Sequence, residues 1–287
     1  MNLTEIRSEL SALRHWRHLR RYSDLSAESI LAWAPDGPPI QRIGDCLWIQ
    51  VDYGGPEPNN IIVPGADTDL VIEQFRQQGI EAIGPLPRPA AKILARRVDL
   101  RLSAAVEHHD YVLDLSRHLS MHGSDYTSLR KSRSRFARRY PEVLESTTLT
   151  DLRSMDLRDE IVRLAGRGAG DDRAFGDYEL RALTNLMADS LAVENLRVFQ
   201  ARDGQRLVAF ALIGQEDKRW ATAHFWKSRR DYPDLQQHLL WAVCRGIART
   251  GTRYLNLEQD LSIAGLRQFK RSLRPRLLLR KYWAELL

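Results

Sequence analysis

Three consecutive strand patterns followed by one long helix pattern constrain the fold of this chain more than any other feature. Asp203-Gly204 joins the first two strands and is a strong signal for a tight hairpin turn. The long helix pattern ends at Gly251 and leads into a strand, a helix and a closing strand. The strands are predicted at residues 196–201, 206–213, 220–226, 254–257 and 277–282, and the helices at residues 233–249 and 265–272. This order predicts an α+β fold with mixed, mostly antiparallel sheets flanked by helices.

The rest of the chain shows the same mixture of short helices and strands. An amphipathic helix is predicted over residues 3–22, with Asn2 and Glu5 as a capping pair. Further helices are predicted at residues 26–33, 67–78, 90–97, 151–164 and 178–191, and further strands at residues 46–51, 61–63, 98–106, 111–115 and 143–147. The glycine-rich residues 166–170 are expected to form a linker. A chain of 287 residues is long enough for two medium domains.

The charge balance favours a polyanionic partner. The chain has 43 Lys+Arg against 37 Asp+Glu, a net charge of +6 and a pI of about 9.5. Two cysteines are too few for a disulfide framework, and no apolar run reaches the roughly 18 to 20 residues of a membrane-spanning helix. The N-terminus carries Glu5 where a secretory signal would be basic and then apolar. We therefore expect a cytoplasmic protein without a transmembrane segment.

Two segments carry a resemblance to a known family. The first is Asp-Tyr-Val-Leu-Asp-Leu at residues 110–115, followed by a basic helix pattern around residues 128–136. The second begins Asn-Leu-Glu-Gln-Asp and spans residues 256–270, with Pro275 and Lys281-Tyr282 after it. Together they resemble the soluble C-terminal domain of bacterial phosphatidylglycerol lysyltransferases. These are tandem GNAT proteins related to the Fem-type peptidyltransferases, which take an amino acid from aminoacyl-tRNA.

The resemblance implies a tandem GNAT-like fold and an aminoacyltransferase. Residues 1–140 would form a degenerate GNAT-like domain that ends in a basic helix, and residues 141–287 the GNAT-like catalytic domain. Aminoacyl-tRNA would be the co-substrate, with no other cofactor, and the acceptor would lie outside the ribosome. The membrane-embedded part of the full-length lysyltransferases is absent from this chain, which favours a soluble small-molecule acceptor over a phospholipid headgroup. The product would be an amide or an ester.

An acyl-CoA-dependent N-acyltransferase is the main alternative. Most GNAT domains hold the pyrophosphate of coenzyme A with a glycine-rich turn at the start of the long helix, because backbone N–H groups must approach it closely. The corresponding residues 228–235 contain no glycine, and Asp231 and Asp234 would repel a pyrophosphate. A non-catalytic nucleic-acid-binding module is a further alternative, but it would leave the block at residues 256–270 unexplained.

Several polar residues near the C-terminal block are candidates for catalysis. In the family that the chain resembles, a lysine of the late helix lies at the 3′ end of the donor, and Lys270 occupies that place. Glu258 and Asp260 follow a predicted buried strand and could accept a proton from the acceptor or bind the ammonium of the aminoacyl group. Pairing with neighbouring arginines is the alternative for both. The residues predicted to line the acceptor pocket are His224, Trp226, Tyr232 and Asn256.

Two groups of cations are candidates for binding tRNA. One forms a stripe on the predicted basic helix: Arg130, Lys131, Arg133, Arg135, Arg138 and Arg139. The other follows the C-terminal block: Arg267, Arg271 and Arg274. A solvated basic face and an anionic membrane surface are alternatives for the stripe. The pairs His108-His109 and His118/His122 have the spacing of metal ligands but no third ligand, so no metal site is predicted.

Overall fold

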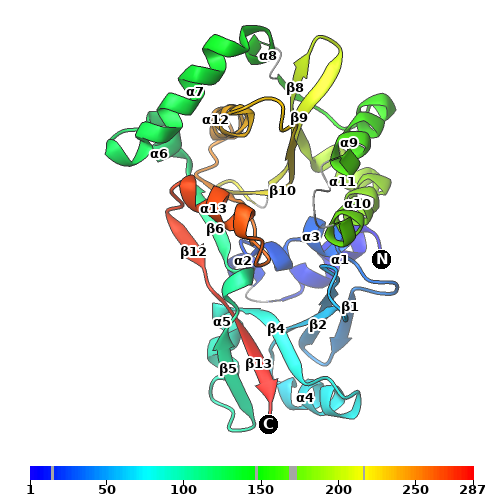
Figure 1. The fold of residues 1–287 in the computed structure, drawn as a ribbon. Helices are drawn as coiled ribbons and strands as arrows, with labels where there is room; N and C mark the ends of the chain where they lie inside the picture. Colours follow the sequence, from blue (N-terminus) through cyan, green and yellow to red (C-terminus); the bar gives the residue numbers. More distant parts are fainter. Residues whose placement is uncertain (14–15, 146–147, 168–172, 216) are drawn as a thin grey trace.

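The centre of the molecule is a seven-stranded sheet with the strand order β12-β6-β11-β10-β9-β8-β7 (Figure 1). This computed structural model describes residues 1–13, 16–145, 148–167, 173–215 and 217–287. Neighbouring strands are antiparallel except β10 and β11, which are parallel. The strands are β6 (Asp110–Asp114), β7 (Thr148–Thr150), β8 (Arg197–Asp203), β9 (Arg206–Gln215), β10 (Trp220–Ser228), β11 (Tyr254–Asn256) and β12 (Leu277–Leu279).

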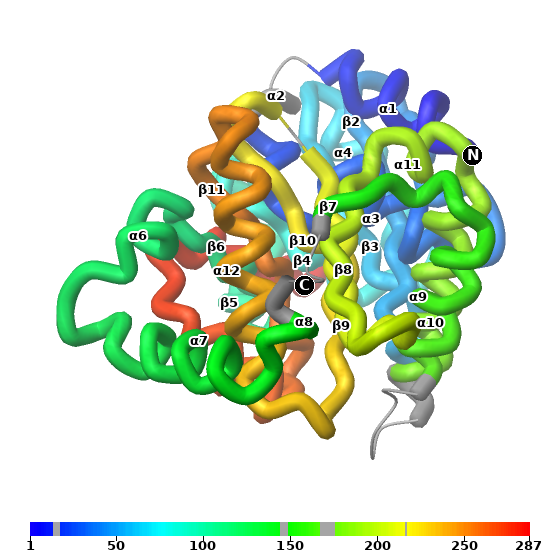
Figure 2. The backbone as a smooth tube through the Cα atoms, turned by 90° about the horizontal axis from the view of Figure 1, so that it is seen from above, coloured from blue at the N-terminus to red at the C-terminus, as the bar shows by residue number. Residues whose placement is uncertain are grey.

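Helices cover both faces of this sheet, and Figure 2 shows the two groups on opposite sides of β8, β9 and β10. Phe136 and Val243 are in the core on the face of α6 (Leu115–Ser120), α7 (Thr127–Arg139), α8 (Pro141–Glu145) and α12 (Leu235–Ala248). Phe210 and Phe225 are in the core on the face of α1 (Leu3–Ser11), α3 (Ala27–Ala32), α9 (Met155–Arg167), α10 (Arg173–Ala188) and α11 (Ser190–Asn195). No helix in the described part of the chain is long and apolar enough to cross a bilayer.

Two three-stranded sheets lie at the other end of the molecule, beside α4 (Thr68–Gln77) and α5 (Arg88–Leu94) (Figure 1). One contains β1 (Ile40–Ile43), β2 (Cys46–Val51) and β3 (Asn59–Val63). The other has the order β4 (Ala82–Pro87), β13 (Lys281–Leu286) and β5 (Leu100–Ala104). The short helix α2 (Trp16–Leu19), a 3-10 turn at Ser23–Leu25 and α13 (Ala264–Ser272) complete the elements used below.

The two halves of the chain exchange strands. β6, from the first half, pairs with β11 and β12 of the second half. β13, the last strand, pairs with β4 and β5 of the first half. Both sheets therefore cross the division predicted at residue 140. The exchange brings Asp110, at the start of β6, beside Lys281, at the start of β13.

The strongest sequence signals correspond to elements of the structure. Asp203 and Arg206 are cross-strand partners, and Gly204 between them has a φ of +56°, which a tight hairpin turn accommodates. The long helix α12 lies inside the range predicted for it, and α7 is the predicted basic helix. The sheets are mixed and mostly antiparallel with helices on their faces, so the predicted fold class is confirmed.

Three local predictions are wrong. Residues 141–145 form α8 instead of a strand, because Pro141 occupies the first helical position, where its missing N–H costs nothing. The helix predicted over residues 3–22 ends at Ser11, and α2 is a separate short helix. The closing strand predicted at residues 277–282 divides into β12 and β13, which belong to different sheets. Of the predicted glycine-rich linker, Gly166 and Arg167 instead form the end of α9, and residues 168–170 lie outside the described residues.

Candidate active site

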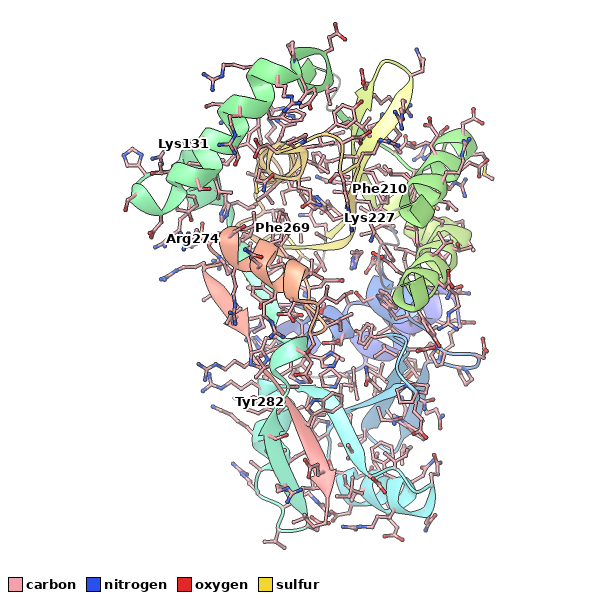
Figure 3. All side chains as sticks on the ribbon, in the orientation of Figure 1. Lys131, Phe210, Lys227, Phe269, Arg274 and Tyr282 are labelled. Carbon is pink, nitrogen blue, oxygen red and sulfur yellow. The ribbon has the colours of Figure 1, made fainter. Side chains whose placement is uncertain are left out.

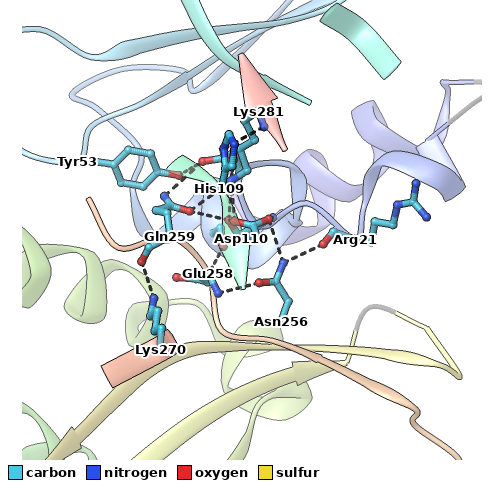
Figure 4. Close-up of polar contacts among 12 residues, drawn as sticks. Arg21, Tyr53, His109, Asp110, Asn256, Glu258, Gln259, Lys270 and Lys281 are labelled. Carbon is cyan, nitrogen blue, oxygen red and sulfur yellow. Dashed lines mark hydrogen bonds and ion pairs between the residues drawn. The ribbon is translucent and has the colours of Figure 1, made fainter. Parts of the chain in front are cut away.

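A buried ion cluster lies where the N-terminal segment, β6 and β13 meet (Figure 4). Lys281 Nζ lies 2.7 Å from Asp110 Oδ1 and also pairs with Asp24, and no side chain of the three is more than 2% exposed. Burial lowers the pKa of Lys281, but the charges of Asp110 and Asp24 raise it more, so its pKa lies above the ordinary value for lysine. Two carboxylates and one ammonium are thus held away from water, which requires further hydrogen bonds.

Neutral polar groups supply those hydrogen bonds. Ser23 donates its backbone N–H to Asp110 Oδ2 at 2.9 Å. The Ser23 hydroxyl lies 2.7 Å from Asp110 Oδ1 and 2.8 Å from Gln259 Oε1, and its one proton is shared between these two acceptors. Asn256 Nδ2 donates to Asp110 Oδ2 at 3.0 Å. The structure therefore places Asn256, which was predicted to line the acceptor pocket, in this buried cluster.

A tight turn after β11 presents Glu258. The backbone N–H of Glu258 donates to Asn256 Oδ1 at 2.7 Å, and Glu258 has a φ of +59°. Leu261 and Ser262 also have positive φ, at +49° and +62°. Such conformations cost non-glycine residues on the order of 1 kcal/mol or more each, and they concentrate at functional sites. The turn brings Glu258 Oε1 to 3.2 Å from His224 Nδ1 on β10, so two predicted site residues meet here.

Asp260, at the end of the same turn, is enclosed by other groups. It accepts two hydrogen bonds from Arg267, at 3.0 and 2.8 Å, and one from the Tyr111 hydroxyl at 2.6 Å. Burial raises the pKa of Asp260, but the hydrogen bonds from Arg267 and Tyr111 lower it more, so the carboxyl stays ionised. Arg267, predicted to bind tRNA, is therefore engaged within the protein, and Asp260 fixes the start of α13.

Lys270 points from α13 toward the same turn and donates to the backbone carbonyl of Gln259 (Figure 4). Its side chain is buried, and no described carboxylate lies within ion-pair distance of its ammonium. Burial lowers the pKa of Lys270 to about 8, although the charge of Glu258 opposes part of this shift. A buried amine that titrates near neutral pH, beside a carboxylate on a strained turn, marks a candidate catalytic site.

Trp226 and Tyr232 lie away from this site. β10 has a bulge between Ala223 and Phe225, and beyond it Trp226 packs into the core on the α12 face. The Tyr232 hydroxyl donates to Asp203, and its ring lies 5.2 Å from the ring of Tyr140. The structure therefore brings His224 and Asn256 to the buried site but not the other two residues predicted to line the acceptor pocket.

Three of the six predicted cations on α7 contact distant parts of the chain or the loop before the helix, and Arg139 lies over the ring of its neighbour Tyr140. Arg130 donates to the backbone carbonyls of Met121 and Gly123, the latter at 2.9 Å. The guanidinium of Arg133 lies 3.5 Å from the centre of the Trp241 ring on α12. Arg135 makes two hydrogen bonds of 2.9 Å to the carboxylate of Asp234. These side chains anchor α7 to its neighbours.

The remaining cations are exposed. Lys131, Arg138 and Arg139 on α7 and Arg271 on α13 have no described carboxylate within ion-pair distance. Arg274 donates to the backbone carbonyl of Asp125 at 3.2 Å, just before α7 begins. The start of α7 and the end of α13 therefore form one basic edge, and Figure 3 shows Lys131 and Arg274 on it.

The histidines with metal-like spacing have other contacts. Both ring nitrogens of His118 face backbone carbonyls, Nδ1 that of Asp114 at 3.1 Å and Nε2 that of Leu273 at 2.6 Å, so a ring N–H is the donor of each hydrogen bond that forms. Burial lowers the pKa of His108 and of His109. Across the described ranges, no three His, Cys, Asp or Glu side chains form a group that could hold a metal ion.

Comparison with known proteins places the chain in a transferase family. The family model described as "Phosphatidylglycerol lysyltransferase, C-terminal" matches residues 65–285. The chain belongs to this family. No curated protein matches the chain.

Solved structures share the fold at low sequence identity. A conserved protein of unknown function from Bacteroides thetaiotaomicron has a TM-score of 0.81 at 20% identity, covering 100% of this chain and 98% of the other. The structure of L-PGS from Bacillus licheniformis has a TM-score of 0.64 at 14% identity, covering 97% and 90%. FemX has a TM-score of 0.57 at 10% identity, covering 100% and 96%.

The ion cluster predicts that Lys281→Met strongly destabilises the protein. The substitution leaves Asp24 and Asp110 buried without their cation, so the free energy of unfolding should fall by about 3 to 5 kcal/mol. Lys227→Met is the matched control, because Lys227 pairs with Glu179 where both side chains are about one-fifth exposed, and its loss should cost about 1 kcal/mol or less. Denaturant unfolding measures both, and equal losses would contradict the account of the cluster.

Replacing Lys270 should affect stability in the opposite direction to replacing Lys281. Its folded-state pKa of about 8 lies below the unfolded value of 10.5, so burying its charge costs stability below pH 8 and the cost disappears between pH 8 and 10.5. Lys270→Met should therefore be at least as stable as the original protein at pH 7, with an advantage that shrinks toward pH 10. Unfolding free energies at the two pH values test this, and an advantage that grows with pH would refute it.

Proposed function

We propose that the protein transfers an amino acid from aminoacyl-tRNA to an acceptor outside the ribosome. The observation that carries the proposal is the set of exposed cations on α7 and α13 for which the described chain provides no carboxylate. Such a surface favours a polyanion, and each phosphate that it neutralises releases counterions. Membership of the lysyltransferase family supports the transfer of an aminoacyl group. Since charged tRNA is a cytoplasmic substrate, the proposal also implies a cytoplasmic protein.

The start of α12 supports a donor other than coenzyme A. Asp234, directly before this helix, has a φ of +69°, and its carboxylate is bonded to Arg135 at both oxygens. Asp231, three residues earlier, pairs with Arg229 at 2.7 Å. Two carboxylates therefore stand where GNAT domains hold the pyrophosphate of the coenzyme. An acyl-CoA-dependent N-acyltransferase is the less favoured function for this reason.

The buried site fits the chemistry of ester aminolysis or transesterification. The acceptor nitrogen or oxygen attacks the ester carbonyl, the carbonyl electrons form an oxyanion, and the ribose oxygen then leaves as the carbonyl reforms. The ammonium of Lys270 offsets the negative charge on the oxyanion, and a carboxylate of the turn accepts the proton that the acceptor loses. With a pKa of about 8, Lys270 exists in both protonated and neutral forms around neutral pH. No covalent enzyme intermediate is needed.

The acceptor in this proposal is a soluble small molecule with an amine or hydroxyl. A phospholipid headgroup is the second candidate, because the family description names phosphatidylglycerol. The protein would be incubated with a pool of tRNAs carrying labelled amino acids and with either a metabolite extract or a lipid extract. Label that moves to one extract and is lost after ribonuclease treatment of the donor supports the proposal. Transfer that resists ribonuclease and needs acetyl-CoA would contradict it.

Two charge-matched double variants test the binding surface. Lys131→Ala with Arg138→Ala removes two exposed cations, so binding of the aminoacyl-tRNA pool should weaken. The slope of log affinity against log salt should flatten by about one to two. Arg130→Ala with Arg135→Ala removes two cations that the protein already engages, so it should change the slope less and lower the melting temperature more. Equal effects of the two pairs on the salt slope would contradict the assignment.

A further inference from the structure

Three side chains from distant parts of the chain meet at Glu258. The Ser29 hydroxyl on α3 donates to Glu258 Oε1 at 3.1 Å. His224 Nδ1 lies 3.2 Å from the same oxygen and 3.2 Å from Ser29 Oγ. Ser29 and His224 are buried, whereas the side chain of Glu258 is 14% exposed. Ser29 also lies outside residues 65–285, which the family model matches.

The backbone around this group is arranged to bring the three together. The bulge in β10 breaks the alternation of the strand at His224, so its ring faces α3 beside Phe225. Gly214 on β9 leaves room for that ring, because a Cβ at Gly214 would lie 2.5 Å from His224 Nε2. Ser26 caps α3 by accepting the backbone N–H of Ser29 at 3.1 Å, which fixes the first turn of the helix.

Glu258 is more accessible to a substrate than the other described carboxylates around the turn after β11. The side chains of Asp24, Asp110 and Asp260 are at most 2% exposed and are paired with Lys281 or Arg267. Both hydrogen bonds to Glu258 end on Oε1, and among the described residues none reaches Oε2. The charged or titratable groups that face Glu258 are His224 on β10, Lys270 on α13 and Tyr53 after β2.

We propose that Glu258 Oε2 accepts the proton of the acceptor nucleophile, and that Ser29 and His224 are positioning residues that hold Oε1. The inference rests on the proposed function. As the nucleophile bonds to the ester carbonyl carbon, its proton moves to Oε2, and the ribose oxygen leaves with the electron pair of the broken ester bond. The proton on Glu258 then passes to that oxygen, which restores the carboxylate. Helix α3, from the first half of the chain, thereby becomes part of the active site.

Kinetics of transfer from labelled aminoacyl-tRNA separate positioning from packing. Ser29→Ala should lower kcat about tenfold while KM for aminoacyl-tRNA changes less than twofold. Thr68→Ala is the matched control, because it removes a buried hydroxyl of α4 that bonds to the carbonyl of Gly65, and it should lower the melting temperature with kcat within twofold. Equal losses of kcat in the two variants would show that Ser29 acts only through stability.

Two substitutions of His224 distinguish positioning from proton transfer. Asn places an N–H donor close to the position of Nδ1, so His224→Asn should retain most of the turnover, whereas His224→Leu should lose about tenfold or more. Glu258→Gln should lose a hundredfold or more, because an amide cannot accept the proton. If His224→Asn is as inactive as Glu258→Gln, the imidazole itself carries the proton and the proposal is overturned.

A spectroscopic measurement tests the same arrangement without turnover. In protein labelled with ¹⁵N-histidine, the ring of His224, assigned by its loss in His224→Asn, should carry its proton on Nδ1 at neutral pH. A neutral ring protonated only on Nε2 would overturn the inference whether or not transfer is observed. If the Nδ1 proton is found but no charged tRNA supports transfer, the arrangement stands and the proposed function fails.

Discussion

The ion pair of Lys281 with Asp110 and Asp24 is the interaction on which the site depends. It joins the last strand, the first strand that crosses between the halves, and the N-terminal segment, and none of its side chains is more than 2% exposed. Burying three charges costs several kcal/mol per ion unless partners compensate, so the pair restricts these segments to one arrangement. Asn256 and Gln259 bond to the same group, and the turn that carries Glu258 starts from it.

The proposed active site therefore uses both halves of the chain. β11 and its turn supply Glu258, α13 supplies Lys270, and α3 supplies Ser29. The carboxylates divide into two roles: Asp24, Asp110 and Asp260 are paired and hold the backbone, whereas Glu258 keeps one oxygen available. Lys270 differs from Lys281, because no carboxylate of the described residues is in contact with its buried ammonium and burial lowers its pKa to about 8. Lys131 and Arg274 lie on the basic edge at the start of α7 and the end of α13, the helix that also carries Lys270.

Local patterns predict the fold better than they predict the site. A turn at Asp203-Gly204 predicts the hairpin of β8 and β9. The helix α12 is predicted by the helical spacing of Leu235, Leu239 and Val243. Alternation places His224 and Trp226 on one face of β10, but the bulge separates them. Composition also cannot show which cations are engaged, because Arg135 meets Asp234 from 99 residues away. Ser29 is 229 residues from Glu258, and no local sequence pattern predicts their contact.

In the proposed reaction, the ester bond of aminoacyl-tRNA is broken only as the aminoacyl group moves to an acceptor. A single-turnover measurement with one purified, labelled aminoacyl-tRNA follows loss of the ester and gain of labelled product together. We expect loss of the ester and gain of labelled product to occur at the same rate and to require the acceptor fraction. Acetyl-CoA should change neither rate. Product formed at an unchanged rate after the tRNA has been deacylated would contradict the proposed reaction.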